Sequence, residues 1–505
     1  MATYALEETT ALAVEEKSKL IKSMRRFDLV FFTICALVGL DTLGTVAKNG
    51  PEGFLWLVVL AILFVAPYML VMSEVGSAFT QEGGPYEWTK MAFGRFHGSM
   101  AAILYWVTNP LWVGGSLAFI ATDAWSSNVF KIGSGTVGDY VFKMVFIWLS
   151  IGVAIIALRY GKWIPNLGAI LRGVVLGFFS LTMIVYAVKH GVAGFPAHKL
   201  SPSRAVFFGL VPILLFNYVG FELQNGAAEE MQDPQKDVPL AVLRSGITGV
   251  LMYVIPILCI ILVLPESKVT GIGGFIDAVT LTFKGVYGGA AHALLVVMTI
   301  SFVGALVTSG SVWMIGSDRI QAVAAYDGAF FPYFGVFNRK LSTPVRVNML
   351  SGIVATVFAI VALAAFNGGD NSKFQVVLDI AISTTLISYI WIFPAALRLR
   401  YTHPEVKRPF THPFGLAGIW VSTILITFWV VLGSWVAIFP DTLEKLFGVG
   451  YGFKDTWGVT RATFELLTLG TLLVIILVGA VGYLAGTKVR SHTATVEIGE
   501  AAVTA

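Results

Sequence analysis

The sequence predicts an all-α membrane protein with about 12 transmembrane helices, and three observations carry this prediction. Hydrophobic residues make up 56% of the chain and charged residues only 13%, whereas a soluble domain carries about 25% charged residues. The apolar residues stand in runs of about 20, the length with which a helix crosses the hydrocarbon core. Lys and Arg are more frequent in every second loop, which is typical of loops on the cytoplasmic side.

The predicted spans begin at residue 27 and follow one another to the C-terminal tail. We expect them at 27–47, 54–78, 99–125, 140–159, 166–188, 205–230, 242–264, 290–318, 346–366, 374–397, 416–438 and 463–486. The polar residues 1–26 lead into the first span without a cleavage site, so this helix is expected to act as signal and anchor. The even number of spans and the Lys/Arg bias predict that both termini are cytoplasmic, in the cytoplasmic (inner) membrane.

Composition and motifs exclude several other classes of protein. The net charge of +4 is too small and too dispersed for a nucleic-acid partner. Cys35 and Cys259 form no CxxC pattern, so neither a disulfide framework nor a metal site is indicated, and no cofactor is expected. No HExxH or GxSxG motif stands in a span, which argues against an enzyme, and no repeated pore loop or ring of charge suggests a channel. The low-complexity tail from Ser491 to Ala505 is expected to be disordered.

The first and sixth spans share a short pattern. Residues 38–41 read Val-Gly-Leu-Asp and residues 219–222 read Val-Gly-Phe-Glu, each beyond the middle of an apolar helix. Each span leads a block of five, and the two blocks enter the membrane from opposite sides, which is typical of inverted-repeat transporters with broken helices. Broken backbone in a membrane must line a cavity or meet a ligand.

The predicted organisation is a tail at 1–26, repeats at 27–188 and 205–397, two further spans within 416–486 and a tail at 487–505.

A shared pattern of four residues can also arise by chance, and the glycines can simply allow close packing of helices. The two acids favour the functional interpretation. A carboxylate at mid-membrane costs roughly 2.5–3.5 kcal/mol on insertion scales, so it is functional by default.

Three groups of residues in predicted cytoplasmic loops carry a family resemblance. They are FNYVGFE at 216–222 with EEMQDP at 229–234 and VPLA at 238–241, GGPYEW at 83–88 with AFG at 92–94, and SDR at 317–319 with AYDGAFFP at 325–332 and TP at 343–344. Together with the span pattern over residues 20–490, the chain resembles the amino acid–polyamine–organocation (APC) superfamily, and most closely its glutamate/γ-aminobutyrate antiporters.

The resemblance implies a five-plus-five inverted-repeat core with two extra C-terminal helices, and alternating access to a central site. It implies that the unwound parts of helices one and six bind the carboxylate and amine of the substrate, and that an aromatic residue at position 216 closes the outer side of the site. The substrate-binding candidates, which include polar residues of helices three and ten, are Val38, Gly39, Asp41, Thr42, Gly44, Asn109, Phe216, Asn217, Gly220 and Ser383. Phe216 and Glu222 are the candidates for gating and proton coupling.

Some of these residues have a second interpretation. Asp41, which departs from the usual small-polar glycine run of the family, pairs with a substrate amine or carries a proton, or else caps the helix that restarts near Leu43. Glu222 is a proton carrier or a structural acid bonded to loop backbone. Arg172 stands near the position of a sodium ion in related transporters, as a fixed charge in its place, or else extends to the cytoplasmic interface.

The other polar residues of the spans are more ambiguous. They line the cavity, or they serve helix packing and bonding within their own helix. They are Asn109, Trp112, Thr308, Ser309, Ser383 and Thr384.

The sequence therefore predicts a secondary active transporter for amino acids or related amines, independent of sodium. A polyamine transporter is the first alternative, and a membrane amino-acid sensor without transport is the second. The expected partners are a small-molecule substrate, protons as a candidate coupling ion, and the lipid bilayer; the oligomeric state stays open.

Overall fold

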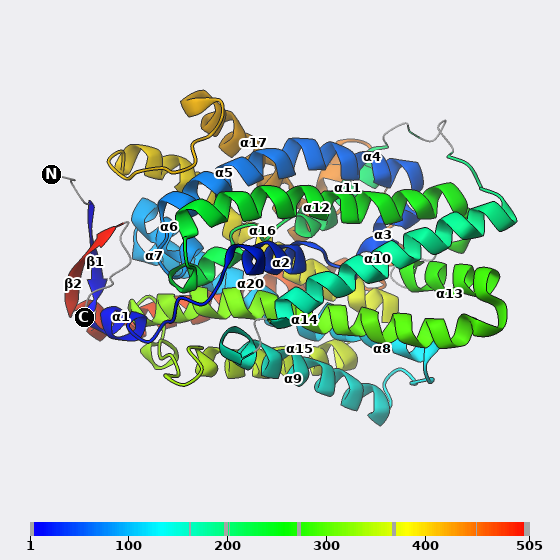
Figure 1. Cartoon of the computed structure of the whole chain (residues 1–505), viewed down its shortest axis with the longest axis horizontal. Helices are drawn as coiled ribbons and strands as arrows, with labels where there is room; N and C mark the ends of the chain where they lie inside the picture. The colour runs from blue at the N-terminus through cyan, green and yellow to red at the C-terminus, as the bar shows by residue number, and fades with distance from the viewer. Residues whose placement is uncertain are drawn as a thin grey trace.

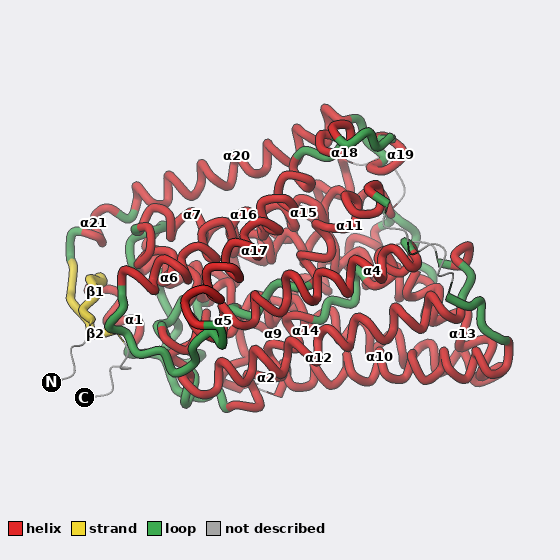
Figure 2. Tube along the Cα trace, turned by 90° about the horizontal axis from the view of Figure 1, so that it is seen from above, coloured by secondary structure: helices red, strands yellow, loops and turns green. Residues whose placement is uncertain are grey.

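The computed structural model describes residues 5–160, 163–195, 200, 203–269, 274–365, 370–450 and 452–498. Long helices run side by side along one axis, and both chain ends lie at the same end of the bundle (Figure 1). We call this the termini end. The helices α18 and α19 lie at the opposite end (Figure 2).

The first five spans contain one interrupted helix and four continuous helical runs. The first span is α2 (Arg26–Leu37) followed after a gap by α3 (Leu43–Lys48). In the second span, α4 (Gly50–Leu60) continues through a π-helical turn (Ala61–Val65) into α5 (Ala66–Ala78). In the third, α7 (Arg95–Trp112) continues through a π-helical turn (Val113–Leu117) into α8 (Ala118–Asn128). The fourth and fifth spans are α9 (Val137–Tyr160) and α10 (Trp163–His190). A short helix, α6 (Gly84–Phe93), joins the second and third spans.

The second five spans repeat this plan. The sixth span is α11 (Arg204–Asn217), which after a gap continues as a 3-10 helix (Leu223–Glu230). The others are α12 (Pro234–Val263), α14 (Ala291–Tyr326), α15 (Val345–Ala365) and α16 (Asp370–Thr402), with α13 (Gly274–Tyr287) before α14. The last two spans are α17 (Gly415–Ile438) and α20 (Arg461–Ala485), and the short helices around them are α18 (Thr442–Leu446), α19 (Phe453–Trp457) and α21 (Thr487–Arg490).

Within the described residues, 10 helical runs are long and apolar enough to cross a membrane. The two expected spans missing from this set are the first and the sixth, the two that the sequence predicts to be broken. Neither half of a broken helix has the length of a full crossing. The all-α fold with two interrupted helices is thus confirmed.

The helix ends differ from the predicted spans in a consistent way. The eighth helix continues to Tyr326 instead of ending at 318, and the tenth covers Asp370–Thr402 instead of 374–397. The apolar run predicts only the part of a helix that lies in hydrocarbon. The hydrogen bonds of the helix continue into polar turns beyond it.

The two chain ends form a small sheet, which corrects the prediction of a disordered tail. Strand β1 (Ala5–Thr10) pairs antiparallel with β2 (Thr493–Ile498), from Ala5 opposite Ile498 to Thr10 opposite Thr493. Residues 493–498 read TATVEI, and their β-branched residues favour a strand once a partner is present. Residues 499–505 lie outside the described residues. The Thr10 side chain accepts a hydrogen bond at the start of α1 (Ala11–Lys17) and donates one to the carbonyl of Tyr326 at 2.6 Å, which fixes the sheet to the end of α14.

Candidate functional site

The first break, at residues 38–42, leaves carbonyl groups at the end of α2 without helical partners. Side chains from three other helices donate to them. Trp313 Nε1 donates to the Ala36 carbonyl at 2.9 Å, Tyr253 Oη to the Leu37 carbonyl at 3.0 Å and Arg172 Nε to the Val38 carbonyl at 2.8 Å. Tyr253 Oη also accepts from the Gly39 amide at 2.7 Å. The break is therefore built into the packing of the neighbouring helices.

Arg172 of α10 is completely buried and connects three helices. Besides the Val38 carbonyl, its guanidinium donates to acceptors on α10 and α14. These are the carbonyls of Gly168 (2.7 Å) and Ala305 (2.8 Å) and the hydroxyls of Thr308 (3.2 Å) and Ser309 (2.6 Å). The interfacial alternative does not describe this side chain, because it points into the bundle. Thr308 and Ser309, candidate cavity groups in the sequence, serve here as partners of a fixed positive charge.

Asp41 lies in the first break and is 1% exposed. Its Oδ2 accepts hydrogen bonds from Trp112 Nε1 at 2.8 Å and from Ser116 Oγ at 2.9 Å, both on the third span. The helix α3 has Thr42 at its N-cap and no side-chain cap hydrogen bond. The capping alternative for Asp41 is therefore not what the structure contains, and the acid faces helix three.

The second break, at residues 218–222, depends on a glycine. Gly220 has φ +119°, and a Cβ on it would lie 2.9 Å from the ring of Trp313, so both its conformation and the space around it exclude a side chain. Beyond it, Glu222 is fully buried. Its Oε1 accepts from Tyr105 and Tyr389, each at 2.6 Å, and its Oε2 accepts from Tyr68. Three tyrosines, and not loop backbone, therefore hold this acid.

A row of aromatic rings extends from the lid candidate Phe216 toward the tyrosines around Glu222. Phe216 meets Trp112 edge-on with ring centroids 5.8 Å apart, Trp112 meets Trp313 at 6.3 Å, and Trp313 meets Tyr105 at 6.0 Å. We call these four residues the aromatic wall. Because Trp112 binds Asp41 and Tyr105 binds Glu222, the wall connects the acids of the two breaks.

Two buried amides near the breaks keep part of their hydrogen-bonding capacity unused. Asn217 Oδ1 accepts from Thr42 Oγ1 at 2.7 Å, which joins the two breaks directly. Asn109 Nδ2 donates to Ser317 Oγ at 2.6 Å. Within the described part of the chain, Asn217 Nδ2 and Asn109 Oδ1 have no partner. A buried polar atom without a partner is costly, so these two atoms are suited to a ligand.

Two other predicted site residues have different surroundings. Ser383 donates at 2.8 Å to the carbonyl of Ile380 in its own helix, which is the back-bonding geometry that the sequence left open. Its neighbour Thr384 bonds within α16 and to Thr108 at 2.9 Å. Gly44 lies against Gly274 at the start of α13. The binding roles of Ser383 and Gly44 stay predictions.

Sequence reasoning missed several residues of this site. They are the aromatic and hydroxyl side chains that hold the two breaks: Tyr68, Tyr105, Ser116, Tyr253, Trp313 and Tyr389. The third span contains a signal that could have found some of them. Tyr105, Asn109, Trp112 and Ser116 are spaced four, three and four residues apart, which places all of them on one face of a helix. The tyrosines of other helices follow no such pattern.

Buried ion pairs lie toward the termini end of the bundle. Arg319 at the end of α14 lies 3.0 Å from Glu230, and Asp327 just beyond α14 lies 3.0 Å from Arg95 and 3.4 Å from Lys90. Burial alone would raise the pKa of Asp327, but Lys90 and Arg95 together hold it below its ordinary value. No cluster of three or more His, Cys, Asp or Glu suited to a metal occurs among the described residues.

Comparisons with known proteins agree with this architecture. The family model for amino acid permeases matches residues 25–451. The chain is 28% identical over 390 residues to the probable agmatine/putrescine antiporter of Lactococcus lactis subsp. lactis, covering 76% of this chain and 81% of that protein. It is 29% identical over 406 residues to an uncharacterized transporter of Legionella pneumophila subsp. pneumophila, covering 78% and 84%. It is 21% identical over 380 residues to the glutamate/gamma-aminobutyrate antiporter of Lactococcus lactis subsp. lactis, covering 70% and 71%.

The matched region contains both breaks, the aromatic wall and the ion pairs of the termini end. A match over most of the chain, on a fold with two interrupted helices, establishes the family. The protein is therefore a multi-pass membrane protein and a secondary transporter, not an enzyme, and it belongs to the amino acid permease family of the APC superfamily.

Proposed function

We propose that the protein is a sodium-independent exchanger of small organic cations, with agmatine and putrescine as the first candidate substrates. The observation that carries this proposal is Asp41, a buried carboxylate in the first break that accepts a hydrogen bond from Trp112, whose indole ring in turn meets that of Trp313. A cation over an indole face gains about 0.5–2 kcal/mol. The same cation would offset the cost of a carboxylate within the membrane.

The names of the relatives support two parts of this proposal, the exchange mechanism and the cationic substrate. The relative from Lactococcus lactis with 28% identity is named for exchange of agmatine and putrescine, which carry amino or guanidino groups and no carboxylate. The relative with 21% identity is named for exchange of glutamate and γ-aminobutyrate. Exchange is common to both names, and cationic substrates fit an acid at the first break better than acidic ones do.

The position of Arg172 supports independence from sodium. Its guanidinium occupies the space between α10, α14 and the first break, and it holds the carbonyl of Val38 and the hydroxyls of Thr308 and Ser309. Oxygen atoms of this kind would otherwise be ligands for a hard cation. Arginine keeps its proton at every accessible pH, so the charge at this position is fixed.

Gating is assigned to Phe216 and Glu222. Phe216 ends α11 just before the second break, where its ring can cover the space beside Trp112. Protonation of Glu222 would remove the negative charge that three tyrosines from three helices now share. The packing of the second break would then loosen, and the balance between the two open states would shift.

The predominance of Lys and Arg in loops of the termini end supports cytoplasmic termini in the cytoplasmic membrane.

A second candidate substrate is a zwitterionic amino acid. The helix α3 begins two residues after Asp41, and the side chain of Asn217, whose amide nitrogen has no partner among the described residues, bonds to Thr42 between them, so a carboxylate could bind beside the amine. This candidate predicts that removal of the substrate's carboxylate weakens transport. The organic-cation proposal predicts that it does not.

The test is counterflow exchange in proteoliposomes loaded with each compound of a panel: agmatine, putrescine, arginine, glutamate and γ-aminobutyrate. We expect saturable exchange of agmatine or putrescine. We also expect that Asp41→Asn lowers exchange at low substrate concentration by about tenfold or more. Glu405→Gln, which removes an exposed negative charge in the turn after α16, is the expression control. Exchange by Asp41→Asn at wild-type rates across the panel would remove Asp41 from the site.

A further inference from the structure

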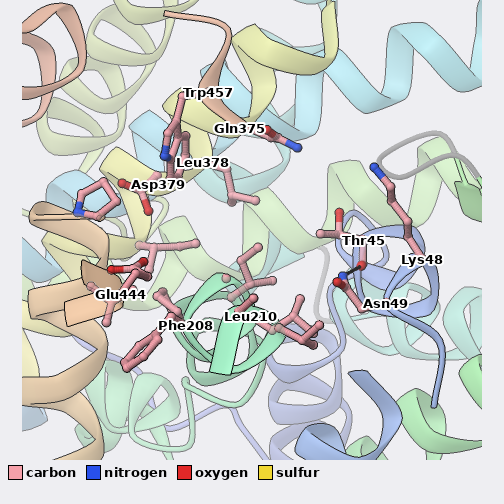
Figure 3. Close-up of a pocket in the computed structure, with 18 of the residues that line it drawn as sticks. Thr45, Lys48, Asn49, Phe208, Leu210, Gln375, Leu378, Asp379, Glu444 and Trp457 are labelled. Carbon is pink, nitrogen blue, oxygen red and sulfur yellow. Dashed lines mark hydrogen bonds between the residues drawn. The ribbon is translucent and has the colours of Figure 1, made fainter. Parts of the chain in front are cut away.

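A cavity of about 410 Å³ is lined in part by α18 and α19, and so lies toward the end of the bundle opposite the termini (Figure 2). Figure 3 shows the residues that line it. Its walls come from α3, α11, α16 and the segment from the end of α17 to α19. Thr45 and Ile213, which line it, stand one helical turn outward from Thr42 and Phe216. The cavity is thus separate from the aromatic wall, yet it follows the same two half-helices toward it.

Two buried acids line this cavity, and neither makes an ion pair within the described part of the chain. Asp379 of α16 is 5% exposed, and no hydrogen bond or ion pair joins it to another residue in the described part of the chain. Glu444 of α18 is 2% exposed, and its Oε2 has no partner there. Figure 3 shows both carboxylates on the same side of the cavity, with the ring of Trp457 beside Asp379. A buried carboxylate without a partner costs free energy unless a cation pairs with it.

The neighbouring cations are engaged elsewhere. Arg461 lies 3.2 Å from Asp441 and 2.8 Å from Glu465, and Lys445 lies 2.5 Å from Asp441. Lys48 is on the opposite side of the cavity from Asp379 in Figure 3. The two acids therefore make one negative wall in which neither carboxylate has an ion-pair partner among the described residues, although the charge of Arg461 acts on Glu444 from beyond ion-pair distance.

The lining distinguishes an organic cation from a metal ion. Apart from the two acids, the cavity is lined by the polar side chains of Thr45, Lys48, Asn49 and Gln375, and by apolar side chains and an indole ring that include Phe208, Leu210, Ile213, Leu378, Ile382 and Trp457. Hard metal cations require six or more oxygen ligands. Two carboxylates beside an indole and aliphatic side chains are suited to an ammonium or guanidinium group with an alkyl chain.

We propose that Asp379 and Glu444 form an outer subsite that binds the ammonium or guanidinium group of the substrate before it passes Phe216 to the central site. This inference rests on the proposed exchange of organic cations and adds to it a second binding position. The subsite acts on substrate that arrives from the end opposite the termini. Substrate that arrives from the termini end meets the central site first.

The sidedness of the subsite gives the test. Exchange of agmatine is measured in proteoliposomes of known orientation, with the substrate concentration varied on one side at a time. We expect Asp379→Asn and Glu444→Gln each to raise the KM on the side of the cavity by about tenfold or more. The KM on the termini side and the maximal rate should stay within about twofold of the wild type. Glu405→Gln, the same change of charge at an exposed position outside the cavity, should have no effect on either side.

A second measurement is independent of transport. In the Asp41→Asn protein, whose central site is weakened, agmatine should still raise the melting temperature. Addition of Asp379→Asn or Glu444→Gln should abolish that shift, and the use of two acids keeps the test valid if one variant fails to fold. Equal KM changes on both sides, or unchanged KM values with a preserved melting shift, would overturn the subsite while leaving exchange by the wild type intact. Absence of both agmatine exchange and any agmatine melting shift in the wild type would overturn the proposed function itself, and the subsite with it.

Discussion

Replacement of Arg172 by methionine tests the reasoning about the first break most directly. The guanidinium makes hydrogen bonds to five acceptors in a fully buried position. The carbonyls of Gly168 and Ala305 lie within helices, and the hydroxyls of Thr308 and Ser309 have other acceptors. The carbonyl of Val38 belongs to the broken segment, so it alone would be left without its donor.

The expected loss follows from that one group. A buried carbonyl left unpaired lowers the free energy of unfolding by roughly 1–3 kcal/mol. The other lost hydrogen bonds also cost free energy, but part of this cost is offset because a buried charge no longer has to be desolvated. We therefore expect Arg172→Met to unfold in detergent several degrees below the wild type and to lose exchange, because the segment that holds Asp41 would no longer be fixed. Arg204→Met is the matched control, since that guanidinium is exposed and holds one carbonyl, that of Phe447, at 2.8 Å.

The assay combines thermal unfolding, followed by tryptophan fluorescence, with substrate exchange in sodium and in choline buffer. Wild-type exchange should be the same in the two buffers. A wild-type protein that strictly requires sodium would refute the role given to Arg172 as the fixed charge. So would an Arg172→Met variant with normal stability and normal exchange.

Three further changes test other parts of the structure. Phe216→Ala should weaken the apparent affinity for substrate several-fold while expression is unchanged, and an unaltered affinity would contradict its role as a lid. Glu222→Gln should flatten the pH dependence of exchange and leave equilibrium binding largely intact; a wild-type pH profile would make the acid structural. Asp327, whose pKa is lowered by Lys90 and Arg95 against the effect of burial, stabilises the fold fully above about pH 4 and loses this contribution as the pH falls through its lowered pKa. The melting temperature of Asp327→Asn should therefore be lower than that of the wild type at pH 7, and the difference should shrink at acidic pH; a constant difference would contradict the ion-pair assignment.

The interpretation of individual residues from sequence was less complete than that of the fold. The sequence placed Asp41 and Glu222 at the two breaks, but it named backbone partners for both as the alternatives. The structure instead gives Asp41 the side chains of Trp112 and Ser116, and it gives Glu222 three tyrosines. Such partners come from segments tens to hundreds of residues away, and a single sequence contains no signal of that pairing.

The positions of the spans and of both breaks follow from the sequence by itself. The length of an apolar run determines whether a helix crosses the hydrocarbon, and this effect is local to the chain. A glycine and an acid close together within such a run marked the positions of the two breaks, because an acid at that depth is costly unless it is functional. Only the tertiary structure decided what surrounds each break. It placed Arg172 in the bundle and not at the interface, paired the two chain ends into a sheet, and left Asp379 and Glu444 beside one cavity. Each of these outcomes depends on which helices meet in space, and the energy of a buried charge is set by those neighbours and not by its own segment.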